Sequence, residues 1–328
     1  MSIEKKGINL NKSKVNEFFS RNASVLSILG ALIILCILWS FMSPYFLTIN
    51  NFINIGTYIS ANGILAAGLT VAMLLGGLDL SHMAVMALSG MVLGILYEQG
   101  YPPVVFISCA ILTGCICGLI NATIITYLRI IPIIATMGTQ FIFRSFAFLS
   151  TNARNIPLNS PVLQYIGFGT FLGIPVMLWI MGAVCVLISL FLKYTQTGRN
   201  IYSVGGSEMA SYLSGVNIRR TKFIAYIISG ACSGIASLLY VSQSMTSMPN
   251  SGQGNEMNQI AAVVLGGLSL TGGKGTIGGT VIGILMLAII SNGMTLLSLS
   301  PYLQMLIKGA VLIIAVFLDA MRSKSDSN

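Results

Sequence analysis

One long polar stretch interrupts an otherwise apolar chain: KYTQTGRNIYSVGGSEMASYLSGVNIRRTK, from Lys193 to Lys222. We call this stretch, residues 193–222, the platform. It holds five of the 17 basic residues and a single acid, Glu208, while strongly apolar sequence continues on both sides. Because Lys and Arg gather in the cytoplasmic loops of membrane proteins, the pattern predicts a cytoplasmic segment between two membrane-embedded halves.

Within the platform, residues 202–216 favour a short amphipathic helix. Apolar Ala210 and Leu213 recur at helical spacing behind a glycine break at 205–206, and Ser207 is suited to cap the helix. A short helix held between membrane segments is a shape that a soluble partner can push. The alternative is an ordinary basic loop, which explains the Lys and Arg but not the ordered small and apolar residues between them.

Composition sets the class of protein. Of the 328 residues, 55% are hydrophobic and only 8% are charged, whereas a soluble domain carries about 25% charged residues. The net charge of +9 lies in the two tails and the platform, where membrane topology places it, so we expect no nucleic-acid partner. The six cysteines all lie in apolar stretches and there is only one histidine, so we expect no metal site.

The chain offers no catalytic motif. GGKGT at 272–276 resembles the end of a phosphate-binding loop, but Leu268 stands where the first glycine belongs and Gly275 stands where Ser or Thr should follow the lysine. G-x-S-x-G and H-E-x-x-H motifs are also absent from the sequence. We therefore expect neither an ATPase nor any other enzyme in this chain.

A window of about nineteen residues predicts about ten spans. They lie at residues 24–42, 54–75, 82–97, 104–127, 131–150, 174–192, 223–245, 258–270, 276–297 and 302–318. The third and the eighth are short enough to be re-entrant or half-helices. The prediction is an all-α polytopic bundle with a cytoplasmic tail at 1–23, one transmembrane domain at 24–319 and a second cytoplasmic tail at 320–328.

Glycine patterns indicate a close-packed bundle with broken helices. GGLDLS at 76–81 recurs as GGLSLT at 266–271, each time between two apolar spans. A duplicated glycine break is the usual pointer to discontinuous helices near a transport path, although two Gly-Leu-rich stretches can also look alike by chance. Several spans also carry G-x-x-x-G, such as Gly114 with Gly118, which lets helix backbones approach closely.

Few polar side chains lie within the spans, and they supply the candidate site residues. Such groups face an interior or a water-filled cavity. The candidates for a translocation path are Asp79, Ser81, Asn121, Thr136, Thr139, Arg144 and Asn292. Lys308 stands inside the last span, where a charge costs about 2.5–3.5 kcal/mol. Either it forms a structural ion pair, with Asp79 as the candidate partner, or it faces the transported solute.

Four blocks of the sequence resemble the membrane permeases of ribose-type sugar ABC importers, a branch of the branched-chain amino acid/ribose permease family. The blocks are GGLDLSHMAVMALSG (76–90), IPIIATMGTQFIFRSFAF (131–148), TGRNIYSVGGSEMASYLSGVNI (197–218) and GQGNEMNQIAAVVLGGLSLTGGKGTIGGTVIGILML (252–287). They occur in order from about the second span to the last. The resemblance implies a fold like that of the larger, cobalamin-type importer permeases, with about ten spans.

The resemblance also implies function and partners. Two permease copies, identical or closely related, pair with a cytoplasmic ATPase that binds the ATP, and an extracytoplasmic binding protein delivers the sugar. The chain itself then holds no cofactor and resides in the lipid of the bacterial inner membrane with both termini cytoplasmic. The expected ATPase-coupling residues are Gly205, Gly206, Glu208, Met209, Ala210, Leu213, Ser214 and Gly215. A self-sufficient secondary transporter or channel for a small polar solute is the alternative, and ribose is not separated from other pentoses, hexoses or a furanose signal.

Overall fold

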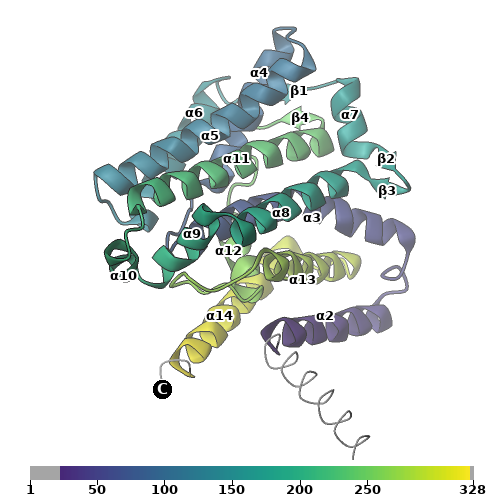
Figure 1. Ribbon diagram of the computed structural model, residues 1–328. Coiled ribbons are helices and arrows are strands. Elements are labelled where there is room, and N and C mark those ends of the chain that lie inside the picture. The colour runs from purple at the N-terminus through teal and green to yellow at the C-terminus, as the bar shows by residue number, and fades with distance from the viewer. Residues whose placement is uncertain (1–22, 326–328) are drawn as a thin grey trace, which may run out of the picture.

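The computed structural model describes residues 23–325, and these form a bundle of helices (Figure 1). The helices in chain order are α2 (Ala23–Met42), α3 (Ile49–Leu74), α4 (His82–Glu98), α5 (Pro103–Tyr127), α6 (Pro132–Leu149), α7 (Pro161–Phe168), α8 (Val176–Tyr194), α9 (Gln196–Gly206), α10 (Glu208–Leu213), α11 (Ile218–Ser244), α12 (Glu256–Leu265), α13 (Ile277–Leu296) and α14 (Pro301–Ser325). The predicted all-α class is confirmed.

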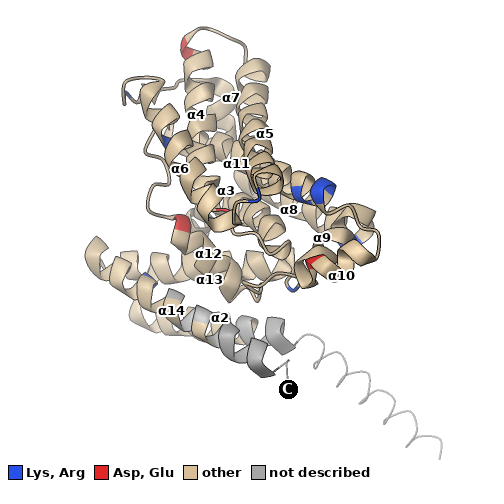
Figure 2. Cartoon of the chain, turned by 90° about the vertical axis from the view of Figure 1, so that its left-hand side faces the viewer, with Lys and Arg blue, Asp and Glu red and all other residues tan. Residues whose placement is uncertain are grey.

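Two very short antiparallel pairings supplement the helices. β1 (Ile156–Pro157) pairs with β4 (Thr246–Ser247), and β2 (Thr170–Phe171) pairs with β3 (Ile174–Pro175). α7, β2 and β3 lie at the opposite end of the bundle from α9 and α10 (Figure 1). Figure 2 shows that uncharged residues make up most of the helices, while basic residues gather beside α9 and α10.

The expectation of about ten spans is wrong. Helices form at all ten predicted segments, but among the described residues only six are long and apolar enough to cross a membrane, namely α3, α5, α6, α8, α11 and α13. α4 has 17 residues and α12 has 10, and ten residues rise only about 15 Å against a hydrocarbon core of about 30 Å. The cobalamin-type architecture that was expected with ten spans loses its support with that count.

Most residues of the two predicted tails lie outside the residues that the structure describes. Residues 1–22 of the predicted tail 1–23 fall outside the described residues, as do residues 326–328 of the predicted tail 320–328. Residues 320–325 continue α14.

α3 and α11 form the centre of the bundle, and glycines let their neighbours approach them. The α5 glycines Gly114 and Gly118 lie against the α11 backbone, where an added Cβ would overlap the carbonyl oxygens of Gly230 and Tyr226. Gly230 in turn lies against the Gly114 carbonyl oxygen. The G-x-x-x-G rows of α5 and α11 thus face each other, as the pattern predicts for helices that associate without a hydrophobic drive.

We expect Gly114→Ala to destabilise the bundle. Alanine is a better helix former than glycine by about 1 kcal/mol, but here its methyl group would collide with a backbone carbonyl that cannot rotate away. Overpacking of this kind costs roughly 1–3 kcal/mol. The thermal unfolding midpoint of the purified protein should fall.

Gly138→Ala is the matched control, because Gly138 also lies within a helix, α6, and an added Cβ there meets no atom within 4 Å. Its midpoint should stay level or rise. Equal midpoints for the two variants would mean that the α5–α11 contact is not close-packed.

Candidate functional site

The two glycine breaks predicted from the sequence are the same local structure. At the end of α3, Gly76 has a φ of +83°, and the Gly76 and Gly77 amides donate back to the carbonyl oxygens of Met73 and Ala72 at 2.9 and 3.1 Å. This is a Schellman cap, in which a residue of positive φ ends the helix.

The cap that ends α12 repeats this geometry. There Gly267 has a φ of +87°, and the amides of Gly267 and Leu268 donate to Val264 and Val263 at 2.8 and 3.3 Å. Glycine occupies the position of positive φ in both breaks because it has no Cβ to resist that conformation. The repeated sequence therefore encodes two equivalent helix ends, and α4 and α13 start after them.

These two breaks meet each other and the end of α9. The Gly273 amide donates to the Leu74 carbonyl at 2.9 Å, which ties the second break to the last residue of α3. The Tyr202 hydroxyl of α9 donates to the Gly275 carbonyl at 3.0 Å. Gly205 packs so closely that a Cβ on it would overlap the Leu74 carbonyl oxygen. We call this contact of Leu74–Gly76, Gly205 and Gly272–Gly275 the glycine junction.

The platform is helical, so the basic-loop alternative is wrong. It divides into α9 and α10 at Ser207, whose Oγ accepts a hydrogen bond from the Ala210 amide at 3.2 Å, as the N-cap prediction required. The predicted helix at 202–216 is too long, because residues 202–206 belong to α9 and α10 ends at Leu213. α9, whose N-cap is Thr195, was not predicted as a separate helix.

The predicted coupling residues fall into two groups. Seven of them lie on the exposed surface of the α9–α10 end: Gly206, Glu208, Met209, Ala210, Leu213, Ser214 and Gly215. Met209 and Leu213 are 69% and 78% exposed although both are large and apolar, which is typical of a surface that docks a partner. Gly205 differs, because it is partly buried in the glycine junction.

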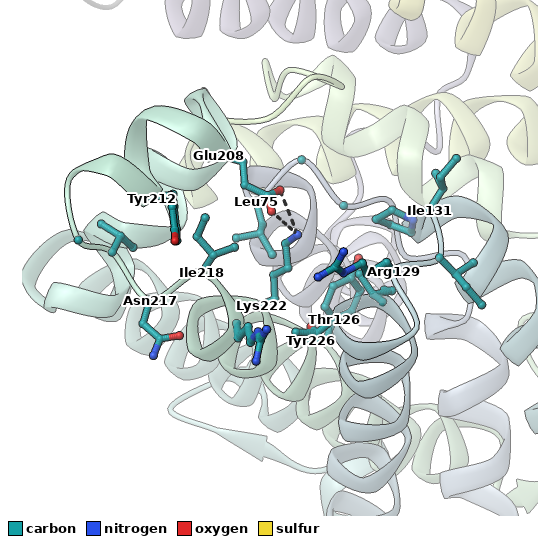
Figure 3. A pocket seen from close by; sticks show the side chains of 18 residues that line it. Leu75, Thr126, Arg129, Ile131, Glu208, Tyr212, Asn217, Ile218, Lys222 and Tyr226 are labelled. Atoms are coloured by element: carbon teal, nitrogen blue, oxygen red, sulfur yellow. Dashed lines mark hydrogen bonds and ion pairs between the residues drawn. The ribbon is translucent and has the colours of Figure 1, made fainter.

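A cavity of about 1010 Å³ separates α10 from the first glycine break (Figure 3). It is lined by Leu75, Gly76, Gly77, Ile125, Thr126, Arg129, Ile130, Ile131, Pro132, Glu208, Tyr212, Gly215, Val216, Asn217, Ile218, Arg219, Lys222 and Tyr226. Three of these residues are basic and one is acidic. The Lys222 ammonium lies 2.9 Å from a Glu208 carboxylate oxygen, which joins α10 to α11 across the cavity wall.

The lining of the cavity therefore has an excess of basic residues, and the cavity reaches the glycine junction. Arg219 lies over the Tyr127 ring at 5.9 Å, which holds its guanidinium at the end of α5. Gly76 belongs both to the cavity wall and to the junction. A segment seated in this cavity would touch the first break directly.

Five of the seven predicted path residues form one buried network beside that break. The two Asp79 carboxylate oxygens accept hydrogen bonds, one from the Ser81 amide and hydroxyl at 2.9 and 2.7 Å and the other from the Ser229 hydroxyl at 2.8 Å. Asn121 donates to Ser81 at 2.7 Å and accepts from Thr139 at 2.6 Å. The Asp79 carboxylate thus accepts from donors of Ser81 at the start of α4 and from Ser229 of α11, and no Lys or Arg among the described residues forms an ion pair with it.

Thr136, the fifth member, closes the network onto the broken segment. Its hydroxyl lies 3.0 Å from the Leu78 carbonyl and 3.1 Å from the Leu80 amide. These contacts fix the extended residues between α3 and α4 against α6.

The remaining path candidates lie elsewhere. Asn292 of α13 exchanges two amide hydrogen bonds with Asn51 of α3, at 2.7 and 3.0 Å. Arg144 donates to the carbonyl oxygens of Pro249 and Ser251 at 2.9 and 2.7 Å, and its second nitrogen lies 3.9 Å from the Glu256 carboxylate. Glu256 was missed from the sequence, because it directly follows a polar connection and was assigned to that loop.

The structure does not bring Lys308 to Asp79. The Asp79 carboxylate is occupied by Ser81 and Ser229, and no ion pair joins it to Lys308 in the part of the chain that the structure describes. Lys308 instead lines a second, smaller recess between α3, α12, α13 and α14. Within residues 23–325, no cluster of His, Cys, Asp and Glu is suited to hold a metal ion.

The chain is similar to known transport permeases over most of its length. Residues 51–316 match the family described as branched-chain amino acid transport system / permease component. The chain is 37% identical over 293 residues to the ribose import permease protein RbsC of Escherichia coli (strain K12), covering 88% of this chain and 91% of that protein.

Two further relatives match a similar share of the chain. Identity is 38% over 294 residues with RbsC of Bacillus subtilis (strain 168), covering 89% of this chain and 91% of that protein. It is 32% over 299 residues with the L-arabinose transport system permease protein AraH of Escherichia coli (strain K12), covering 90% and 91%. No solved structure matches the chain.

Proposed function

The chain belongs to the family described as branched-chain amino acid transport system / permease component, and from this premise we propose that it is the membrane subunit of an ATP-driven importer for ribose or a related monosaccharide. A transport permease of this kind is a multi-pass inner-membrane protein and not an enzyme. The relatives support a sugar as the substrate, since they are named as permeases for ribose and for L-arabinose.

The proposed complex has three further components. A second permease copy, identical or closely related, completes the transmembrane unit, an extracytoplasmic protein delivers the sugar, and a cytoplasmic ATPase docks at the α9–α10 end. Both chain termini are then on the cytoplasmic side with the platform. The gathering of basic residues at that end supports this orientation.

The observation that carries the mechanism is the glycine junction. The ATPase seats on the exposed Met209 and Leu213 of α10, and an acidic segment of it enters the basic cavity. A push on α9 then moves Gly205 against Leu74 and Gly273 together, because these atoms are already in backbone contact. Both broken helices would shift in one step, as rocking between outward and inward access requires.

The test is reconstitution in liposomes. Purified alone, the chain should take up no labelled pentose or hexose, and uptake should appear only when the ATPase, the sugar-binding protein and ATP are all supplied. A control with non-hydrolysable ATP analogue separates binding from turnover. Uptake by the chain alone, driven by a solute or proton gradient, would instead establish the alternative of a secondary transporter or channel.

A further inference from the structure

A second recess, distinct from the basic cavity, lies where α3, α12, α13 and α14 meet. Its lining residues are Tyr58, Asn62, Asn258, Gln259, Ile284, Leu287, Ser291 and Lys308. We call it the amide recess. Its volume of about 20 Å³ is enough for a group the size of one water molecule. It therefore has room for a single hydroxyl group and not for a whole sugar.

A chain of hydrogen bonds fixes which atom Gln259 leaves without a partner. The Asn62 amide nitrogen donates to the Tyr58 carbonyl at 2.8 Å, and the Gln259 amide nitrogen donates to the Asn62 side-chain oxygen at 2.6 Å. Turning either amide over would place two acceptors face to face. The chain therefore has one polarity, which starts at a backbone carbonyl and ends at Gln259 Oε1.

Gln259 is only 4% exposed, and its Oε1 is buried without a hydrogen-bond partner among the described residues. A buried acceptor left unpaired costs about 1–3 kcal/mol. A donor bound next to this oxygen would therefore be stabilising, and the adjoining recess has room for one.

Lys308 lines the same recess and needs an acceptor, whereas Gln259 Oε1 needs a donor. The Lys308 ammonium makes no hydrogen bond or ion pair with any residue that the structure describes. An ammonium group only donates, so it seeks an acceptor. The recess is thus lined by one residue with an unpaired acceptor, Gln259 of α12, and by one with an ammonium donor, Lys308 of α14.

The unpaired Gln259 oxygen and the Lys308 ammonium together determine which chemical group fits the recess. A carboxylate would suit Lys308 but meet the Gln259 oxygen as a second acceptor, and a cation would suit Gln259 but be repelled by Lys308. A neutral hydroxyl donates to one and accepts from the other. We propose that the amide recess is a recognition subsite of the translocation path, which takes one hydroxyl group of the transported sugar between Gln259 and Lys308.

The position of the recess fits this role, which rests on the proposed importer function. Tyr58 is 46% exposed on the membrane-spanning helix α3, and a polar surface there belongs beside water or a second copy. α12 carries Gln259 and ends at the second glycine break. Movement at the glycine junction would therefore shift the Gln259 side of the subsite relative to Lys308 and release the sugar.

The experiment measures the maximal rate of ATP-driven uptake by the complete reconstituted transporter, at saturating loaded binding protein, for a panel of labelled pentoses and hexoses. Gln259→Leu and Lys308→Met should each lower the rate for the transported sugar at least about tenfold, because a site that hydrogen-bonds a hydroxyl discriminates strongly when that bond is lost. Gln304→Leu is the control, since Gln304 is on α14 but does not line the recess, and it should transport normally.

Monodeoxy analogues that the binding protein still accepts separate recognition from folding. The wild type should transport one analogue as slowly as Gln259→Leu transports the parent sugar, and Gln259→Leu should no longer distinguish that analogue from the parent. Equal rates for wild type and both variants, or an equal loss for every analogue, would overturn the subsite while leaving the importer in place. Absence of uptake by the wild type for every sugar would overturn the importer itself.

Discussion

Replacing Gly205 with alanine is expected to abolish sugar uptake, whereas the same change at Gly206 should leave uptake intact. A Cβ on Gly205 would overlap the Leu74 carbonyl oxygen and lie 2.7 Å from the Gly273 amide nitrogen. Both are backbone atoms and they bond to each other at 2.9 Å, so neither can rotate out of the way. The junction must open, and α9 then loses its contact with both broken helices.

The measurement compares ATP hydrolysis with uptake in the reconstituted complex. Gly205→Ala should still bind the ATPase and co-purify with it, because the exposed α10 surface is unchanged, but uptake should fall more than tenfold. Gly206 is the adjacent residue of the same helix, and no atom lies within 4 Å of a Cβ built on it. If Gly205→Ala transported as well as Gly206→Ala, the route from α9 to the two breaks would have to be abandoned.

The contrast between these glycines shows what the sequence reveals and what it does not. Both were expected to serve coupling, because both stand at a break in a polar stretch. The two glycines differ in whether another backbone lies against them. That contact is between segments far apart in the sequence, so the sequence around a glycine does not reveal it. The repeated break was predictable for the opposite reason: Gly76 and Gly267 are demanded by their own positive φ, which is a local property.

Charge was harder to interpret than shape. Asp79 was the acid expected to pair with Lys308, but it accepts hydrogen bonds from the neutral side chains of Ser81 and Ser229, which a search for opposite charges does not find. Glu256, which starts α12 and lies near Arg144 of α6, was not predicted to be part of an ion pair. Hydropathy likewise located the apolar segments but not their ends, and the span count depends on the ends.

The second large effect is expected at that overlooked pair. Arg144→Met should cause loss of folded protein, because it removes the cation from a site where both side chains are about 10% exposed. The Glu256 carboxylate would keep its hydrogen bond from Gln140 at 3.0 Å, but its charge would be stranded. Breaking a buried pair in this way costs roughly 3–5 kcal/mol. The carbonyl oxygens of Pro249 and Ser251 would also lose their donor.

Abundance in the membrane and the thermal unfolding midpoint are the measurements. Adding Glu256→Gln to Arg144→Met should recover part of the loss, since it removes the stranded charge while keeping an amide oxygen for Gln140. A double variant as poor as the single one would mean that the Arg144 bonds to the two carbonyls, and not the charge pair, hold the connection at 248–255.

Arg154→Met is the matched control, and it decides between geometry and burial. Arg154 binds Glu98 through two nitrogens, at 2.9 and 2.8 Å, and this lowers the pKa of the Glu98 carboxyl from its ordinary value. By distance it is a far better pair than Arg144 with Glu256 at 3.9 Å. Its side chains are 57% and 46% exposed, however, so water replaces what the substitution removes. We therefore expect no measurable change in abundance for Arg154→Met, although the shorter ion pair is the one that it breaks.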